Sequence, residues 1–178
     1  EASFMDMTNV AKVKEAIRPN TRLLWLETPS NPMLKIFDIA ALADVAKKAN
    51  IPLAVDNTFA TPMLQRPLDL GATVVMHSTT KYLNGHSDVV GGAALTSDSE
   101  LADKLRFLQK STGGVPSPFD CYMVLRGLKT LGVRMQQHVR SAKVLAEHLA
   151  GHKNVARVLY PGLTSHPGHL IAQKQMKG

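Results

Sequence analysis

The first hundred residues contain several short apolar runs, and each run ends in polar or turn-forming residues. Their length and aliphatic content are typical of buried β-strands. They lie at residues 21–27, 52–55, 73–77 and 89–96. Apolar residues with helical spacing predict helices at residues 9–17, 38–50 and 99–110, with Asp38 as the cap of the second and Ser97 or Asp98 as the cap of the third. Strands that alternate with helices in this way indicate an α/β fold around a largely parallel sheet.

The second half of the chain has a mainly helical pattern. Helices are predicted at 119–128 and 170–176, and a strand is predicted at 155–160. A long amphipathic helix is predicted at 131–149, because one apolar stripe runs along it. Its members are Leu131, Met135, His138, Ala142, Leu145 and Leu149. We therefore expect a large domain over residues 1–130, then a connecting helix and the start of a smaller domain over 131–178.

Polar side chains follow three successive predicted strands. The first strand ends at Glu27, before a loop that contains Asn31, and the second ends in Asp-Asn-Thr at 56–58. The third ends in Ser-Thr-Thr-Lys at 78–81. The carboxyl ends of neighbouring parallel strands lie at one edge of a sheet, where ligands bind in α/β folds. We therefore expect these groups to converge in one cleft.

A lysine, a carboxylate and several hydroxyls at one sheet edge suit the chemistry of pyridoxal 5'-phosphate (PLP). A lysine amine can hold the aldehyde of PLP as an imine, and a carboxylate can keep the pyridine nitrogen protonated. Lys81 fits the first role, and Asp56, 25 positions earlier, fits the second. Ser78 and Thr80 flank the lysine and are candidates for binding the phosphate.

Other interpretations of the same residues remain open at this point. The stretch 78–81 matches the S-x-x-K pattern of serine acyl-transfer enzymes, although their S-D-N and K-T-G elements have no match here. His86 and Asp88 suggest a metal site, but spacing places no third ligand beside them. A lysine at a strand end is often only a solvated surface residue, and the stretch 56–58 also suits a turn.

Composition narrows the function class. Hydrophobic residues make up 44% and charged residues 20% of the 178 residues, which is typical of a globular chain. The net charge is +7, but the basic residues are scattered over helical segments, so we expect no nucleic-acid partner. No apolar run approaches the roughly 20 residues of a membrane span, so we expect no membrane association. Cys121 is the only cysteine, which excludes an intrachain disulfide and favours a cytoplasmic location.

Longer stretches resemble the PLP-dependent enzymes of cysteine and methionine metabolism. The PLP signature of that family is similar to residues 55–59 (Val-Asp-Asn-Thr-Phe) and to the segment 78–88, which begins Ser-Thr-Thr-Lys-Tyr. Further similar stretches lie at 27–32, 126–131, 160–163 and 165–167. The resemblance covers the chain in order. It implies the PLP-dependent transferase fold of type I, a three-layer α/β/α arrangement with a mostly parallel sheet and a smaller C-terminal α/β domain.

The resemblance also implies roles for six residues. Lys81 is expected to form the internal aldimine with PLP and later to move protons, and Asp56 is expected to pair with the pyridine nitrogen. The remaining cofactor contacts are expected from Ser78 and Thr80 at the phosphate, Asn31 near the ring hydroxyl and Thr58 near the ring.

Within the family, the segment 111–122 is most similar to cystathionine γ-lyases and their close γ-synthase relatives. This implies a carbon–sulfur lyase of transsulfuration that cleaves L-cystathionine at Cγ to cysteine, 2-oxobutanoate and ammonia. Cystathionine γ-synthase, which uses an O-acylhomoserine and cysteine, and methionine γ-lyase are close alternatives. A non-catalytic assembly module is the alternative from another class. The family further implies a small amino-acid substrate and a homotetramer built from two active dimers.

The chain is short for this family. We expect it to be an internal fragment that lacks the N-terminal third, which helps to hold the phosphate and stacks on the ring. The C-terminal region that binds the substrate carboxylate is also expected to be missing. The sequence therefore predicts the cofactor with more certainty than it predicts the substrate.

Overall fold

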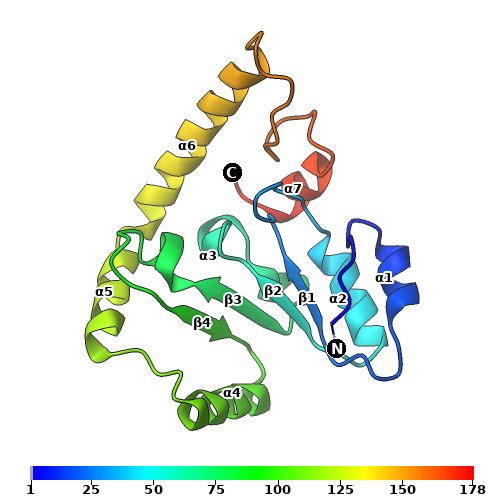
Figure 1. Cartoon of the computed structure of the whole chain (residues 1–178), viewed down its shortest axis with the longest axis vertical. Coiled ribbons are helices and arrows are strands. Elements are labelled where there is room, and N and C mark those ends of the chain that lie inside the picture. Colours follow the sequence, from blue (N-terminus) through cyan, green and yellow to red (C-terminus); the bar gives the residue numbers. More distant parts are fainter. Residues whose placement is uncertain (1) are drawn as a thin grey trace.

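A computed structural model of the chain describes residues 2–178. Within them one sheet has the strand order β1-β2-β3-β4 (Figure 1). Strands β1, β2 and β3 are parallel, and β4 runs antiparallel to β3. The mostly parallel α/β sheet is therefore confirmed. The strand bounds are Leu24–Glu27 (β1), Leu53–Asp56 (β2), Val74–Ser78 (β3) and Gly92–Leu95 (β4).

Helices connect the strands and make up most of the chain after β4. The predicted caps form as expected, since Asp38 accepts a hydrogen bond from the Ala41 N–H and Asp98 accepts one from the Leu101 N–H. Such bonds satisfy N–H groups that have no partner inside the helix, and so fix where the helix begins. The bounds are Val10–Ala16 (α1), Ile39–Lys48 (α2), Thr61–Leu64 (α3), Pro67–Leu70 (η1, a 3₁₀ turn), Thr79–Leu83 (η2, a π turn), Ser99–Thr112 (α4), Pro118–Leu128 (α5), Leu131–Ala150 (α6) and His169–Gln175 (α7).

The main core lies between the sheet and helices α1 and α2. Side chains alternate between the two faces of a strand, so Leu53 and Val55 of β2 point toward α2, where they share a fully buried cluster with Ile39. Trp25 lies on the opposite face of the sheet and is 49% exposed. Asp56 follows Val55, so it projects from the same face as Trp25. This alternation directs the carboxylate away from the apolar core.

One sequence prediction for the C-terminal part is wrong, whereas the long helix predicted at 131–149 is confirmed as α6. The segment 155–160 forms no strand, because it begins in a turn in which the Val155 N–H donates to the His152 carbonyl at 2.9 Å, and it pairs with no strand of the sheet. The apolar stripe of α6 is buried only in part: Leu131 and Met135 are buried, whereas Leu145 is 60% exposed. Figure 1 shows that α6 leaves the body of the molecule along its length, although Ala146 near its end is buried. No helix among residues 2–178 has the length and apolar character needed to cross a bilayer.

A buried network of amides ties α7 to the strand ends. Gln65 is only 1% exposed, and its Nε2 donates to the Thr28 carbonyl and to Asn57 Oδ1, both at 2.9 Å. Its Oε1 accepts a hydrogen bond from Gln175 Nε2 at 3.0 Å. Asn57 directly follows Asp56, so this network fixes the backbone beside the predicted cofactor carboxylate.

Replacing Gln65 with leucine in the whole protein is expected to lower the free energy of unfolding by about 3 kcal/mol. The reason is that two buried acceptors, the Thr28 carbonyl and Asn57 Oδ1, lose their hydrogen bonds, and each unsatisfied group costs about 1–3 kcal/mol, whereas the half-buried Gln175 keeps its bond to the Phe37 carbonyl. Urea unfolding followed by circular dichroism measures the loss. Gln136→Leu on the exposed side of α6 is the matched control and should change the midpoint little. An equal effect of both substitutions would contradict the role given to the network.

Candidate active site

Lys81 lies in a tight turn at the carboxyl end of β3. The chain passes directly from β3 into η2, and Lys81 has the non-helical torsion angles φ −94° and ψ −125° inside that turn. The turn is closed by the Asn84 N–H, which donates to the Thr79 carbonyl at 3.1 Å, and by the Gly85 N–H, which donates to the Lys81 carbonyl at 2.7 Å. Single π turns of this kind are frequent at functional sites.

One open cavity of about 930 Å³ lies at this edge of the sheet. Its size is within the usual range for a small-molecule site. All six residues that the sequence analysis selected line this cavity, from the ends of three parallel strands and the segments that follow them. They are Asn31, Asp56, Thr58, Ser78, Thr80 and Lys81. The structure therefore brings the predicted site residues together, although the role of each remains a prediction.

Hydrogen bonds link the ends of β2 and β3. Asp56 Oδ1 accepts a hydrogen bond from the Thr58 N–H at 2.9 Å, and Thr58 Oγ1 accepts one from the Ser78 N–H at 2.8 Å. The Thr80 hydroxyl is engaged with Gly91, from which it accepts at 2.9 Å. The Ser78 hydroxyl has no hydrogen-bond partner within residues 2–178. Of the two predicted phosphate ligands, Ser78 is thus the one whose hydroxyl is uncommitted.

Glu27 adds a second carboxylate to the cavity. It is paired in register with Asp56 on the neighbouring parallel strand. Burial raises the pKa of Glu27, and the negative charge of Asp56 raises it further, while a hydrogen bond from the Asn31 backbone N–H opposes the shift. His77 lies nearby, and burial lowers its pKa, against the effect of the Asp56 charge. Glu27 was recognised in the sequence only as a polar strand end and had no assigned role.

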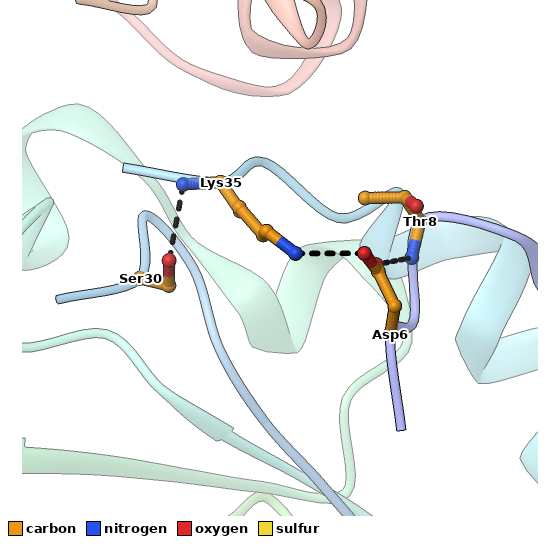
Figure 2. Close-up of polar contacts among 4 residues, drawn as sticks. All are labelled: Asp6, Thr8, Ser30 and Lys35. Atoms are coloured by element: carbon orange, nitrogen blue, oxygen red, sulfur yellow. Dashed lines mark hydrogen bonds and ion pairs between the residues drawn. The ribbon is translucent and has the colours of Figure 1, made fainter. Parts of the chain in front are cut away.

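The loop that carries Asn31 is tied to the N-terminal segment (Figure 2). Ser30 Oγ accepts a hydrogen bond from the Lys35 N–H, and Lys35 Nζ forms an ion pair with Asp6 Oδ2 at 2.7 Å. Hydrogen bonds from Lys35 and Thr8 lower the pKa of Asp6 to about 2. The stabilising effect of the ionised group is therefore present above the ordinary carboxyl pKa and is lost as the pH falls toward 2. Both side chains of the pair are about half exposed, so the pair orients the loop more than it stabilises the fold.

Helix α6 contributes two residues that the sequence analysis did not select. Arg134 and His138 line the cavity from its first turns. A basic residue on an amphipathic helix is usually solvated, so the sequence offered no signal that separates Arg134 from its neighbours. The start of α6 thus contacts the part of the chain that carries Lys81. The predicted boundary between two domains at residues 130 and 131 remains a prediction.

The groups in the cavity fit PLP by their chemistry. A primary amine, three carboxylates and several hydroxyls line one space, and the Ser78 hydroxyl among them is uncommitted. An aldehyde needs an amine, a pyridinium nitrogen needs an anion and a phosphate needs hydrogen-bond donors. The set of side chains therefore offers one partner for each reactive part of this cofactor.

Comparison with known proteins agrees with this assignment. The family described as Cys/Met metabolism PLP-dependent enzyme matches residues 1–178, which is the whole chain. The chain belongs to this family. PLP dependence, which was predicted from the residues, is thereby confirmed as a property of the family.

Relatives that match the chain over nearly its whole length carry different names. The chain is 57% identical over 98% of its length to a probable cystathionine γ-synthase from Herpetosiphon aurantiacus. It is 55% identical, also over 98%, to a cystathionine β-lyase from Coxiella burnetii. Its structure matches that of cystathionine γ-lyase from Lactobacillus plantarum, solved with L-serine, with a TM-score of 0.97 over 99% of the chain at 42% identity. The chain spans 55%, 46% and 46% of these proteins, or about half their length.

Proposed function

We propose that the protein is a PLP-dependent carbon–sulfur lyase that cleaves L-cystathionine at Cγ to cysteine, 2-oxobutanoate and ammonia. The observation that supports it most strongly is the convergence of Lys81, Asp56 and Ser78 on one cavity in a chain of this family. The choice of γ-cleavage rests on the likeness of the segment 111–122 to γ-lyases. The substrate is thus a small amino acid, and by the same likeness the protein is a cytoplasmic homotetramer.

The residues of the cavity have complementary tasks in this proposal. When bound, PLP supplies an electron-withdrawing ring that makes protons next to the amino group of a substrate acidic. Lys81 would hold the cofactor through its amine, and that amine, once released, would take up and return a proton of the substrate. Asp56 stabilises positive charge at the ring nitrogen, and its position is held by the Thr58 N–H at 2.9 Å. Further cofactor contacts are proposed for Ser78, Thr80, Asn31 and Thr58.

Cystathionine γ-synthase is the second candidate. The observation in its favour is the 57% identity to the probable γ-synthase from Herpetosiphon aurantiacus, slightly above the 54% identity to a cystathionine γ-lyase from Dictyostelium discoideum. Methionine γ-lyase is a third. A non-catalytic assembly module is less consistent with the site, because such a module has no physical need for an amine and three carboxylates in one cavity.

Reduction with borohydride is expected to fix PLP on one lysine of the whole protein, and peptide mapping should identify it as Lys81. The physical reason is that Lys81 is the lysine that lines the cavity among residues 2–178. The measurement is the visible absorption band before and after reduction, followed by mass spectrometry of the labelled peptide. Lys47→Ala, at an exposed position of α2, is the control and should leave the label in place. A label on another lysine would refute the site, and no visible band would favour the assembly module.

The products then separate the candidate reactions. Cystathionine is expected to give cysteine and 2-oxobutanoate. Formation of cystathionine from an O-acylhomoserine and cysteine at a higher rate would instead identify a γ-synthase. Methanethiol from methionine would identify a methionine γ-lyase.

A further inference from the structure

The turn that carries Lys81 does not hold its own shape. η2 comprises only five residues, and Lys81 interrupts it with non-helical torsion angles. A single helical turn is unstable in isolation, because few hydrogen bonds compensate for the ordered backbone. The carbonyl groups at its end also have no partner inside the turn. The direction of the Lys81 side chain therefore depends on contacts from other elements.

Arg134 on α6 makes the most direct of these contacts. Its Nη1 donates to the carbonyl of Tyr82, the residue next to Lys81, at 2.8 Å. Its Nη2 donates to the Gly127 carbonyl at 2.9 Å, and its Nε donates to Thr130 Oγ1 at 3.0 Å. The rigid, planar guanidinium thus joins the Lys81 turn to the junction of α5 and α6. None of the ion pairs found within residues 2–178 involves Arg134, so its known partners are carbonyl and hydroxyl oxygens.

Two glycines allow this close approach. Gly85 has φ +78°, and a Cβ atom there would overlap the guanidinium of Arg134. A Cβ atom at Gly127 would overlap the carbonyl of Asn84, which ends the Lys81 turn. Leu83 of the same turn packs against apolar residues at the start of α6. The carboxyl-terminal side of the turn is therefore held mainly by α5 and α6, with Arg134 as the polar link.

We propose that Arg134 is a positioning residue that directs the Lys81 amine into the cavity by holding the Tyr82 carbonyl. The inference rests on the proposed covalent role of Lys81. Arg134 acts through the backbone of the turn, so its loss should impair what the Lys81 amine does. Loss of Arg134 should leave the contacts of Asp56 and Ser78 with PLP largely intact, because hydrogen bonds at the ends of β2 and β3 position these two residues.

A double-mutant cycle in the whole protein tests this inference through cofactor binding, not turnover. Arg134→Gln is expected to weaken PLP binding about tenfold when Lys81 is present, since it removes the charge-assisted hydrogen bond to the Tyr82 carbonyl of the turn. In the Lys81→Ala background the same substitution should change PLP binding less than about twofold, because the group it positions is gone. PLP affinity is measured by absorbance and fluorescence titration.

Further variants separate positioning from general damage to the fold. Arg134→Lys keeps the charge without the planar fork and should show an intermediate loss. Arg134→Ala should regain PLP affinity when guanidinium ions are added at non-denaturing concentration. Arg140→Gln, further along the same helix and exposed, is the matched control and should bind PLP as the unmodified protein does.

The outcomes distinguish this inference from the proposed function. Equal losses in both backgrounds, or an Arg134→Lys variant without any loss, would overturn the positioning role while the proposed function stands. Equal PLP binding with and without Lys81, together with no borohydride label on it, would overturn the proposed function and this inference with it. Loss confined to the background that contains Lys81, with rescue by guanidinium, supports the inference.

Discussion

Replacement of Lys81 by alanine in the whole protein is expected to lower kcat by at least about 10³-fold and to abolish the covalent cofactor bond. Lys81 is the amine that faces the cavity among the described residues, so no neighbouring lysine can take over the task. The fold should survive, because Lys81 interrupts its turn, which is held by carbonyl contacts and the packing of Leu83. PLP should still bind, more weakly, through the remaining polar groups.

Product formation and the absorption spectrum measure this effect together. Lys110→Ala, at an exposed position near the end of α4, is the control and should leave both unchanged. Small amines added to Lys81→Ala should restore a fraction of the turnover, because they can supply the missing base. A Lys81→Ala variant that keeps a reducible covalent bond to PLP would show that another lysine holds the cofactor.

The sheet and the site could be predicted because they obey strong local rules. β1, β2 and β3 are short apolar runs that alternate with amphipathic helices, and such a pattern has one common architecture. Parallel strands gather their carboxyl ends at one edge, so Asp56 and Lys81 had to approach each other once both were placed at strand ends. The order of polar residues along the chain therefore carried three-dimensional information.

Features that depend on distant contacts could not be predicted in the same way. The apolar segment 155–160 has strand-like composition, but a strand needs a neighbouring edge, and this segment pairs with none of the strands β1 to β4. Leu145 continues the apolar stripe of α6, yet it is 60% exposed, while the next residue, Ala146, is buried. Arg134 looked like a solvated charge, because its partners are backbone carbonyls that no sequence pattern reveals.

The site also contains a carboxylate pair that the strand register imposes. Glu27 and Asp56 are direct partners on β1 and β2, and side chains at paired positions project from the same face. Two like charges this close disfavour joint ionisation, which agrees with the raised pKa of Glu27. Each carboxylate accepts a hydrogen bond from a backbone N–H, Glu27 from Asn31 and Asp56 from Thr58, so it is the raised pKa of Glu27 that makes Asp56 the better candidate to pair with the pyridine nitrogen.

Asp56→Asn is therefore expected to lower kcat by about 10²-fold in the whole protein while the geometry of the strand end is kept. Asparagine retains an oxygen that can accept the Thr58 N–H, so the substitution removes the charge and little else. Loss of a fixed electrostatic partner in an active site typically costs about 10²–10³-fold in rate. Steady-state turnover and the absorption band of bound PLP measure the effect, and Asp44→Asn at an exposed position of α2 is the control.

The same substitution should also move two neighbouring pKa values, in the cofactor-free protein as well. The Asp56 charge raises the pKa of Glu27, so the pKa of Glu27 should fall toward its ordinary value once that charge is removed. Burial should still keep the pKa of Glu27 above its ordinary value. That charge also raises the pKa of His77 against burial, so the pKa of His77 should fall further below its ordinary value. Titration by NMR reports both groups. If neither pKa moves while kcat falls, Asp56 acts through the shape of the strand end, and its electrostatic role in the proposed site is wrong.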